Sequence, residues 1–221
     1  MTKDLNHARE PWKAFQVRQR NLDEKRDAVL LSAAHLFLER GYRQASMSEL
    51  ARLLKITKPA LYYYFRNKEE ILVACYKAGI TVIETLLDGA ATHGTGLDKI
   101  RAYVEAYTTA VVMHDFGRCV AMLDDAELST RTRQQVRNLK RKIDATMRAY
   151  IEEGIADGSI AVPDAKIASF AMAGAINWIG IWYKPGGPLS ASEIASQFAT
   201  LFVDGLRTRA AVPVRQQNSA R

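Results

Sequence analysis

Three consecutive tyrosines, Tyr62, Tyr63 and Tyr64, stand between Pro59 and a run of charged residues in the stretch TKPALYYYFRNKEEIL at 57–72. A phenol hydroxyl can donate a hydrogen bond to a phosphate oxygen, and its ring can pack on a sugar or on a thymine methyl group. The run YYYF fits neither the 3.6-residue period of a core helix nor the alternation of a strand. We therefore expect a binding surface here rather than a piece of hydrophobic core.

Residues for catalysis or metal binding are sparse. Cys75 and Cys119 form no CxxC pair and have no histidine at a metal-ligand spacing, so we expect two buried, reduced thiols, with a redox switch as the alternative. His114 and Asp115 are neighbours, but adjacent residues on a helix diverge by about 100° and no nucleophile accompanies them. We expect no catalytic site, no metal site and no cofactor, and hence no enzyme.

The elements that must position the tyrosines begin with two helices. The apolar residues over 22–40 recur with a helical period, and Gly41 follows where a glycine cap belongs. Ser46 and Glu49 form a capping-box pattern, in which the serine oxygen accepts a free backbone N–H and the glutamate returns a bond to the serine. A second, short helix is therefore predicted to start after Ser46.

A third helix carries the tyrosines. Thr57 can cap it, Pro59 is tolerated in its first turn, and we expect it to span residues 58–65. Residues 67–70 repeat the cap-and-acid pattern and open a fourth helix that reaches about residue 87. Two short helices, separated by a three-residue turn and braced by a longer helix on each side, make a helix-turn-helix.

On the third helix Leu61 and Phe65 share one face, which we expect to be buried. Pro59 and Tyr63 point away from it, and the other two tyrosines lie on the flanks. The second helix of a helix-turn-helix enters the major groove of DNA, so the tyrosines are predicted to face DNA. For Tyr64 the alternative is a partly buried ring that only touches a phosphate.

The distribution of charge agrees with a polyanionic partner. Residues 1–68 hold 14 Lys and Arg against 7 Asp and Glu, which is 14 − 7 = +7 and accounts for the whole net charge; residues 69–221 hold 17 of each. A basic first third joined to a neutral body is typical of a nucleic-acid-binding module with a second domain. We expect residues 1–21 to be a flexible basic arm, which either reaches the minor groove or is only a tail.

The stretch GYRQASMSELARLLKITKPALYYYFRNKEEIL at 41–72, with the helix before it, resembles the DNA-binding domain of the TetR family of bacterial transcriptional regulators. The resemblance covers about residues 22–72. It departs at Pro59-Ala60, where many members have Gly or Thr. The resemblance and the wheel together indicate these DNA contacts: Ser46, Ser48, Thr57, Lys58, Pro59, Ala60, Tyr62, Tyr63, Tyr64 and Lys68. For Lys68 the residues add an argument, because a lysine at a helix start opposes the helix dipole unless an anion is present.

The rest of the chain is predicted to be helical, over 97–113, 117–126, 129–157, 164–183 and 190–211. We expect an all-α protein with a helix-turn-helix domain at 22–68, a helical ligand-binding and dimerisation domain at 69–211, and a tail at 212–221. A single helix-turn-helix reads only a few base pairs, so specificity favours a two-fold dimer on a palindromic operator. The resemblance implies that the last two helices form the dimer interface; the alternative is that both are simply core.

The body also carries candidates for an effector site. The C-terminal sequence is similar to TetR-family regulators of fatty-acid and steroid breakdown, several of which respond to acyl-CoA thioesters. An amide in an apolar helix must be hydrogen-bonded, either to a neighbour or to a ligand. The candidates, whose alternative is ordinary core, are Tyr103, Tyr107, Met113, Phe116, Met122, Met147, Tyr150, Asn177 and Trp178. A run of basic residues from 131 to 142 could meet the phosphates of a coenzyme A or be a solvated face.

Together these expectations describe a cytoplasmic, homodimeric DNA-binding regulator. The resemblance implies a repressor that leaves its operator when a small hydrophobic metabolite, such as an acyl-CoA, binds. The alternative is an architectural DNA-binding protein without a sensor. No signal sequence or membrane span is expected, because the most apolar stretch, at 167–183, is short and contains polar residues.

Overall fold

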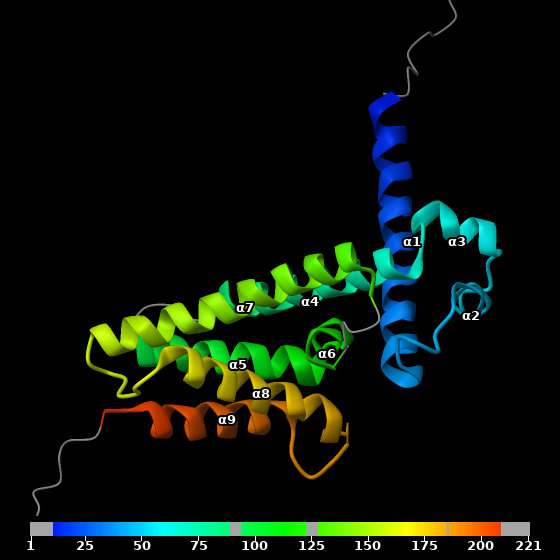
Figure 1. Cartoon of the computed structure of the whole chain (residues 1–221). Helices are drawn as coiled ribbons and strands as arrows, with labels where there is room; N and C mark the ends of the chain where they lie inside the picture. Colours follow the sequence, from blue (N-terminus) through cyan, green and yellow to red (C-terminus); the bar gives the residue numbers. More distant parts are fainter. Residues whose placement is uncertain (1–10, 89–93, 123–127, 185, 209–221) are drawn as a thin grey trace, which may run out of the picture.

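The computed structural model describes residues 11–88, 94–122, 128–184 and 186–208, and the regular elements within these ranges are helices (Figure 1). The prediction of an all-α fold is confirmed. In chain order the helices are α1 (Pro11–Arg40), α2 (Met47–Leu53), α3 (Lys58–Tyr64), α4 (Lys68–Asp88), α5 (Gly96–Met113), α6 (Asp115–Met122), α7 (Thr130–Ala156), α8 (Ala165–Trp182) and α9 (Ala191–Leu206).

Helix α1 stands across one end of the molecule with α2 and α3 beside it, and α4 leads from this part into the bundle of α5, α7, α8 and α9 (Figure 1). At the junction α6 packs against α1, α4 and α5. There the Nε2 atom of His35 in α1 lies 2.5 Å from the Oδ2 atom of Asp115 in α6. One cluster of buried hydrophobic residues runs from Val29 to Leu206, so the helix-turn-helix and the body share a continuous core.

Helix α1 contains the stretch for which the apolar period predicted a helix, and it ends where the prediction placed its end. Val29, Ala33 and Phe37 are each at most 2% exposed. Gly41 follows the helix with a φ of +79°, the left-handed conformation that a glycine adopts without steric cost. The two short helices α2 and α3 thus pack against the buried face of α1.

The predicted caps at the starts of the short helices are confirmed. The Ser46 hydroxyl accepts a hydrogen bond from the backbone N–H of Glu49 at 3.1 Å, and the Thr57 hydroxyl accepts one from Ala60 at 3.3 Å. The Asn67 side chain likewise accepts from Glu70 N–H at 2.8 Å at the start of α4. These bonds satisfy donors that have no partner inside a helix, and they fix where each helix begins.

The turn of the helix-turn-helix contains a strained residue. Lys55 has a φ of 53°, in the left-handed region that residues with a Cβ seldom adopt. The next residue, Ile56, donates its N–H to the carbonyl oxygen of Ala51 at 3.0 Å, which closes α2 with a wrapped-back turn. This turn sets the angle at which α3 leaves α2.

At the N-terminus the structure differs from the prediction. Helix α1 begins at Pro11 rather than at residue 22, so residues 11–21 belong to the helix, and the flexibility expected of the arm stays a prediction. Proline suits a first turn, because its missing N–H would have no helical partner in that position. Residues 1–10 lie outside the described residues.

Two boundaries in the body also differ. Helix α9 ends at Leu206, because Arg207 forms an isolated antiparallel bridge with Ile160, whereas the prediction extended the helix to residue 211. Helix α6 begins at Asp115, two residues before the predicted start. The predicted end of α6 at 126 and the tail at 212–221 lie outside the described residues.

The two cysteines face each other where α4 and α6 approach closely. A Cβ on Gly79 would lie 2.3 Å from the carbonyl oxygen of Phe116, so only glycine permits this approach. Cys75 and Cys119 are free thiols with no exposed surface. A hydrogen bond with Cys75, together with burial, raises the pKa of the Cys119 thiol far above its usual range. The expectation that both thiols are buried is confirmed, and their reduced state stays a prediction.

We predict that a thiol-specific disulfide reagent will label neither cysteine in the native protein. The thiolate is the reactive form, and burial both disfavours it and excludes the reagent. Both thiols should react after denaturation in guanidinium chloride, as measured by absorbance of the released chromophore. Rapid labelling of either thiol in the folded protein would show that α4 and α6 separate readily.

Candidate functional site

Helix α3 presents two tyrosines to solvent and buries the opposite side. Leu61 and Phe65 are 0% and 1% exposed, whereas Tyr62 is 43% and Tyr63 69% exposed. This is the orientation that the helical wheel predicted. Exposed aromatic side chains on one face of a helix are typical of a binding surface. The tyrosine face of α3 is therefore available for a groove of DNA.

Tyr64 has a different environment from the other two tyrosines. It is half-buried and packs against the core, and its ring meets that of Tyr63 edge to face at 5.3 Å. The guanidinium of Arg26 in α1 donates to the carbonyl oxygen of Tyr64 at 3.3 Å and lies 4.3 Å from the centre of the Phe65 ring. The main-chain carbonyl of Tyr64 thus links α3 to α1, and the partial burial of its ring agrees with the alternative prediction, whose phosphate contact stays a prediction. Arg26 was missed, because its position on the polar side of α1 carried no signal.

The remaining DNA-contact candidates in the first turns of α2 and α3 lie together on the surface. Six of them are exposed: Ser46, Ser48, Thr57, Lys58, Pro59 and Ala60. Lys58 brings a positive charge to the start of α3. With the exposed tyrosines, these residues make a surface suited to phosphate contacts and base-edge contacts.

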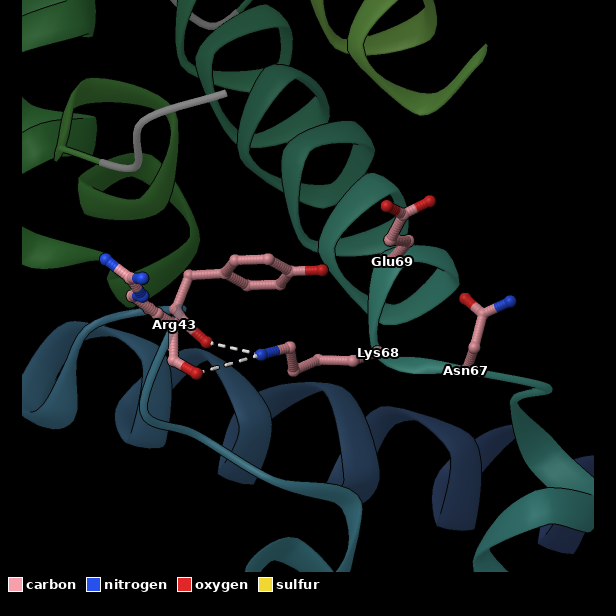
Figure 2. Close-up of a pocket in the computed structure, with 5 residues that line it drawn as sticks. Arg43, Asn67, Lys68 and Glu69 are labelled. Carbon is pink, nitrogen blue, oxygen red and sulfur yellow. Dashed lines mark hydrogen bonds between the residues drawn. The ribbon is translucent and has the colours of Figure 1, made fainter. Parts of the chain in front are cut away.

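Lys68 does not belong to this surface. Its ammonium donates to the carbonyl oxygens of Tyr42 and Arg43 at 2.7 and 3.3 Å (Figure 2). It also donates to the carbonyl oxygen of Ala45 at 3.0 Å and lies 4.2 Å from the centre of the Tyr42 ring. These three acceptors match the three donors of an ammonium. These carbonyl oxygens, rather than a phosphate, offset the unfavourable interaction of the lysine charge with the helix dipole. A phosphate contact by Lys68 is therefore not supported.

A shallow pocket of about 450 Å³ surrounds this contact. It is lined by Tyr42, Arg43, Asn67, Lys68 and Glu69, from the α1–α2 loop and the start of α4 (Figure 2). Lys68 reaches across to the loop, so it ties the start of α4 to the α1–α2 connection.

Five of the predicted effector residues come together between α5, α7 and α8. The Tyr103 hydroxyl donates to the carbonyl oxygen of Ile143 at 2.8 Å, and the Tyr107 hydroxyl donates to Oδ1 of Asn177 at 2.6 Å. The Tyr103 ring meets those of Tyr107 and Tyr150 edge to face. Met147 of α7 is also fully buried. Burial raises the pKa of both hydrogen-bonded tyrosines, so both phenols are neutral donors.

A buried hydroxyl lies next to this cluster in the sequence. Thr108 is fully buried, and its Oγ1 atom has no hydrogen-bond partner in the described part of the chain. A buried polar group without a partner is costly, so such a group calls for an explanation. The hydroxyl of Thr108 can therefore form a further hydrogen bond in the interior of the body.

Three other effector candidates lie elsewhere. Met113 and Trp178 are 61% and 63% exposed, so they lie outside the buried cluster, and their part in effector binding stays a prediction. Phe116 lines a surface groove of about 490 Å³ between α1, α4 and α6, outside the cluster. Helical spacing alone does not distinguish an apolar side chain that faces the core from one that faces outward. The side chain of Met122 lies outside the described part of the structure.

Helices α8 and α9 expose an apolar face. Its large side chains are between 43% and 67% exposed, and they are Ile167, Phe170, Trp178, Ile181 and Trp182 of α8 and Leu201 of α9. Gly174 and Gly205, which are exposed on the same two helices, have open space where a side chain would begin, with no atom within 4 Å of that position. An apolar patch of this kind on two adjacent helices is typical of a protein interface. The alternative prediction, that both helices are only core, does not fit this exposure.

Neither a metal site nor a membrane span is found in the part of the chain that the structure describes. Among the described residues no three His, Cys, Asp or Glu side chains are grouped so that they could hold a metal ion. No helix in the described ranges is both long and apolar enough to cross a membrane.

Two family models match the sequence. Residues 29–75 match the family described as bacterial regulatory proteins, tetR family, and residues 93–206 match the family described as tetracyclin repressor-like, C-terminal domain. Among curated proteins, the HTH-type transcriptional repressor KstR2 of Mycolicibacterium smegmatis is 25% identical over 194 residues, covering 82% of this chain and 90% of KstR2. The fatty acid metabolism regulator protein of Bacillus subtilis is 20% identical over 184 residues, covering 82% and 95%.

Solved structures have the same fold. The crystal structure of AibR in complex with isovaleryl coenzyme A and operator DNA superposes with a TM-score of 0.72 at 27% identity, covering 82% of this chain and 97% of AibR. The structure of the ketosteroid transcriptional regulator KstR2 of Mycobacterium tuberculosis gives a TM-score of 0.73 at 21% identity, covering 84% and 96%. The fold and the arrangement of the two parts are thus shared over nearly the whole of these proteins.

Proposed function

Because the chain belongs to the TetR family and is a DNA-binding transcriptional regulator rather than an enzyme, we propose that it is a homodimeric repressor of a palindromic operator. A small hydrophobic metabolite releases it from DNA, and an acyl-CoA thioester is the candidate class. Its place of action is the cytoplasm, where the operator lies. The observation that carries the proposal is the orientation of α3, which buries Leu61 and exposes Tyr62 and Tyr63.

The apolar face of α8 and α9 supports the dimer. Trp178 and Leu201 are among the most exposed large apolar side chains of the described residues, and they lie on the last two helices described. Burial of such side chains against a second copy releases water and stabilises the pair by about 25 cal/mol per Å² of apolar surface. A two-fold dimer presents two copies of α3 to successive major grooves, which is the geometry that a palindromic operator requires.

The effector class is supported by the body and by the relatives. KstR2 is described as a ketosteroid regulator, and AibR was solved with isovaleryl coenzyme A. In this chain the buried hydroxyl of Thr108 has no hydrogen-bond partner among the described residues, so it could bond a polar atom of a ligand. On α7 the exposed Arg137 belongs to the basic run at 131–142, which suits the phosphates of a coenzyme A.

Repression is supported by a relative that is a repressor, and release by an effector is supported by a population argument. KstR2 is named a repressor. A ligand that binds better to a dimer whose two α3 helices are wrongly spaced for DNA shifts the population away from the operator. A ligand that bound both arrangements equally would change nothing, so the effector must discriminate between them.

The experiment that tests the proposal is a thermal-shift screen of the purified protein against acyl-CoAs, the matching free acids and steroid acids, followed by operator-binding assays with each hit. A thioester that raises Tm and weakens DNA binding supports the proposal. An Arg133→Ala/Arg137→Ala variant should lose affinity for the CoA thioester and keep it for a free acid. Equal weakening of both ligands would rule out a phosphate role for α7.

The second candidate is an architectural DNA-binding protein without a sensor, which the dense packing around Tyr103 and Met147 favours. Under that alternative no compound in the screen binds the folded protein, so none raises its Tm, while DNA binding remains tight. The two candidates are therefore separated by the same screen.

A further inference from the structure

The first two residues of α4 hold the helix from opposite sides. Lys68 donates to three carbonyl oxygens of the α1–α2 connection. Glu69 points the other way, toward the start of α7 in the body. Its carboxylate accepts the backbone N–H of Ser129 at 2.7 Å, the Ser129 hydroxyl at 2.6 Å and the hydroxyl of Thr132. The start of α4 is thus fastened to both parts of the protein.

Glu69 acts as a cap for α7 supplied from outside that helix. Ser129 is the residue that caps α7, and the first turn of α7 has no acidic residue of its own. Between residues 131 and 142 the helix instead carries six basic residues and no acidic one. A carboxylate at a helix N-terminus is stabilised by the free N–H groups and by the helix dipole. Glu69 therefore provides the negative charge that the start of α7 lacks.

The same carboxylate lies close to the end of the recognition helix α3. Only Phe65, Arg66 and Asn67 separate α3 from α4. This connection is held tightly, because Glu70 accepts from the N–H of Arg66 at 2.7 Å and donates its own N–H to Asn67 at 2.8 Å. A displacement of the first turn of α4 must therefore move α3 as well.

We propose that Glu69 is a positioning residue for DNA binding, through which the start of α7 in the body sets the orientation of the recognition helix. The contact joins residues about sixty positions apart in sequence, and Figure 1 shows the first turn of α7 near the start of α4. The link to an effector rests on the proposed function, but the positioning of α3 rests only on DNA binding.

The hydrogen bonds from Ser129 and Thr132 lower the pKa of Glu69 below its ordinary value of 4.5, with burial opposing them slightly. A carboxylate whose pKa is lower in the folded than in the unfolded state contributes stability above the unfolded pKa and loses it as the pH falls through the folded pKa. The contact is therefore fully formed at neutral pH. We therefore expect acid denaturation of the wild type to begin at a lower pH than that of a variant without the carboxylate.

The test compares operator affinity at a temperature at which every variant is folded. The DNA is a duplex selected from random sequences by the wild-type protein. Glu69→Gln should weaken binding about tenfold, a typical size for coupling between sites. Thr132→Val removes one donor from the other end of the contact, on a buried residue that cannot touch DNA, and should also weaken binding. The Glu69→Gln/Thr132→Val double variant should bind no worse than Glu69→Gln, since both remove one interaction.

Glu153→Gln is the matched control. Glu153 is a carboxylate of α7 that pairs with Lys99 within the body, so its loss should lower Tm by a similar amount and leave operator affinity within about twofold of wild type. Wild-type affinity for Glu69→Gln, or additive effects in the double variant, would overturn the proposal while leaving the proposed function intact. If the wild-type protein selects no DNA sequence, the proposed function itself fails.

Discussion

Leu201→Asp is expected to turn the dimer into a monomer and to weaken operator binding about 100-fold or more. Leu201 is 67% exposed on α9 and belongs to the apolar face that α8 and α9 share. A carboxylate placed in an apolar interface loses its hydration and finds no partner, which costs several kcal/mol per copy. In a two-fold dimer the cost is incurred twice.

The oligomeric state is measured by sedimentation or light scattering, in which a monomer has a mass of 24.7 kDa. Operator affinity should fall in parallel, because a monomer offers one recognition helix and reads only one half-site. Ile155→Asp is the control, since Ile155 is an exposed apolar residue of α7 outside the α8/α9 face; it should remain a dimer. Unchanged mass and affinity for Leu201→Asp would place the dimer interface elsewhere.

Replacing Tyr62 and Tyr63 together with alanine is expected to weaken operator binding by about 100-fold without lowering Tm. Base-edge and phosphate contacts typically contribute about 1–3 kcal/mol each, and both rings are exposed enough that their loss removes little core packing. Tyr63→Phe, which keeps the ring and loses the hydroxyl, should show a smaller loss. The comparison therefore separates ring contacts from hydrogen bonds.

The salt dependence of these variants distinguishes the roles of the residues. Lys58→Ala should reduce the slope of log affinity against log salt concentration by about one, because a phosphate contact releases a counterion. The tyrosine variants should keep the wild-type slope and lose discrimination between operator and random DNA. Met113→Ala, at an exposed site in the body, should alter neither quantity. A double tyrosine variant with wild-type affinity would mean that α3 does not carry the DNA contacts.

Much of the helix-turn-helix was predictable, because its information is local. Ser46 and Thr57 cap their helices within three residues, and the four-residue spacing of Leu61 and Phe65 determines which face of α3 is buried. Once that face is known, the exposure of Tyr63 follows from helix geometry. The start of α1 at Pro11 was missed because that stretch lacks the apolar period on which the prediction relied.

The sequence by itself determined the helical class, the caps, the orientation of α3 and the basic charge of the first third, since each depends on neighbours along the chain. Only the tertiary structure decided that Lys68 binds carbonyl oxygens of the α1–α2 connection, that Trp178 faces outward and that Glu69 caps α7. These contacts join residues distant in sequence or depend on which side of a helix its neighbours cover. Apolar periodicity identifies a face of a helix but not its partner, and a charged side chain takes whichever donors or acceptors the fold brings to it.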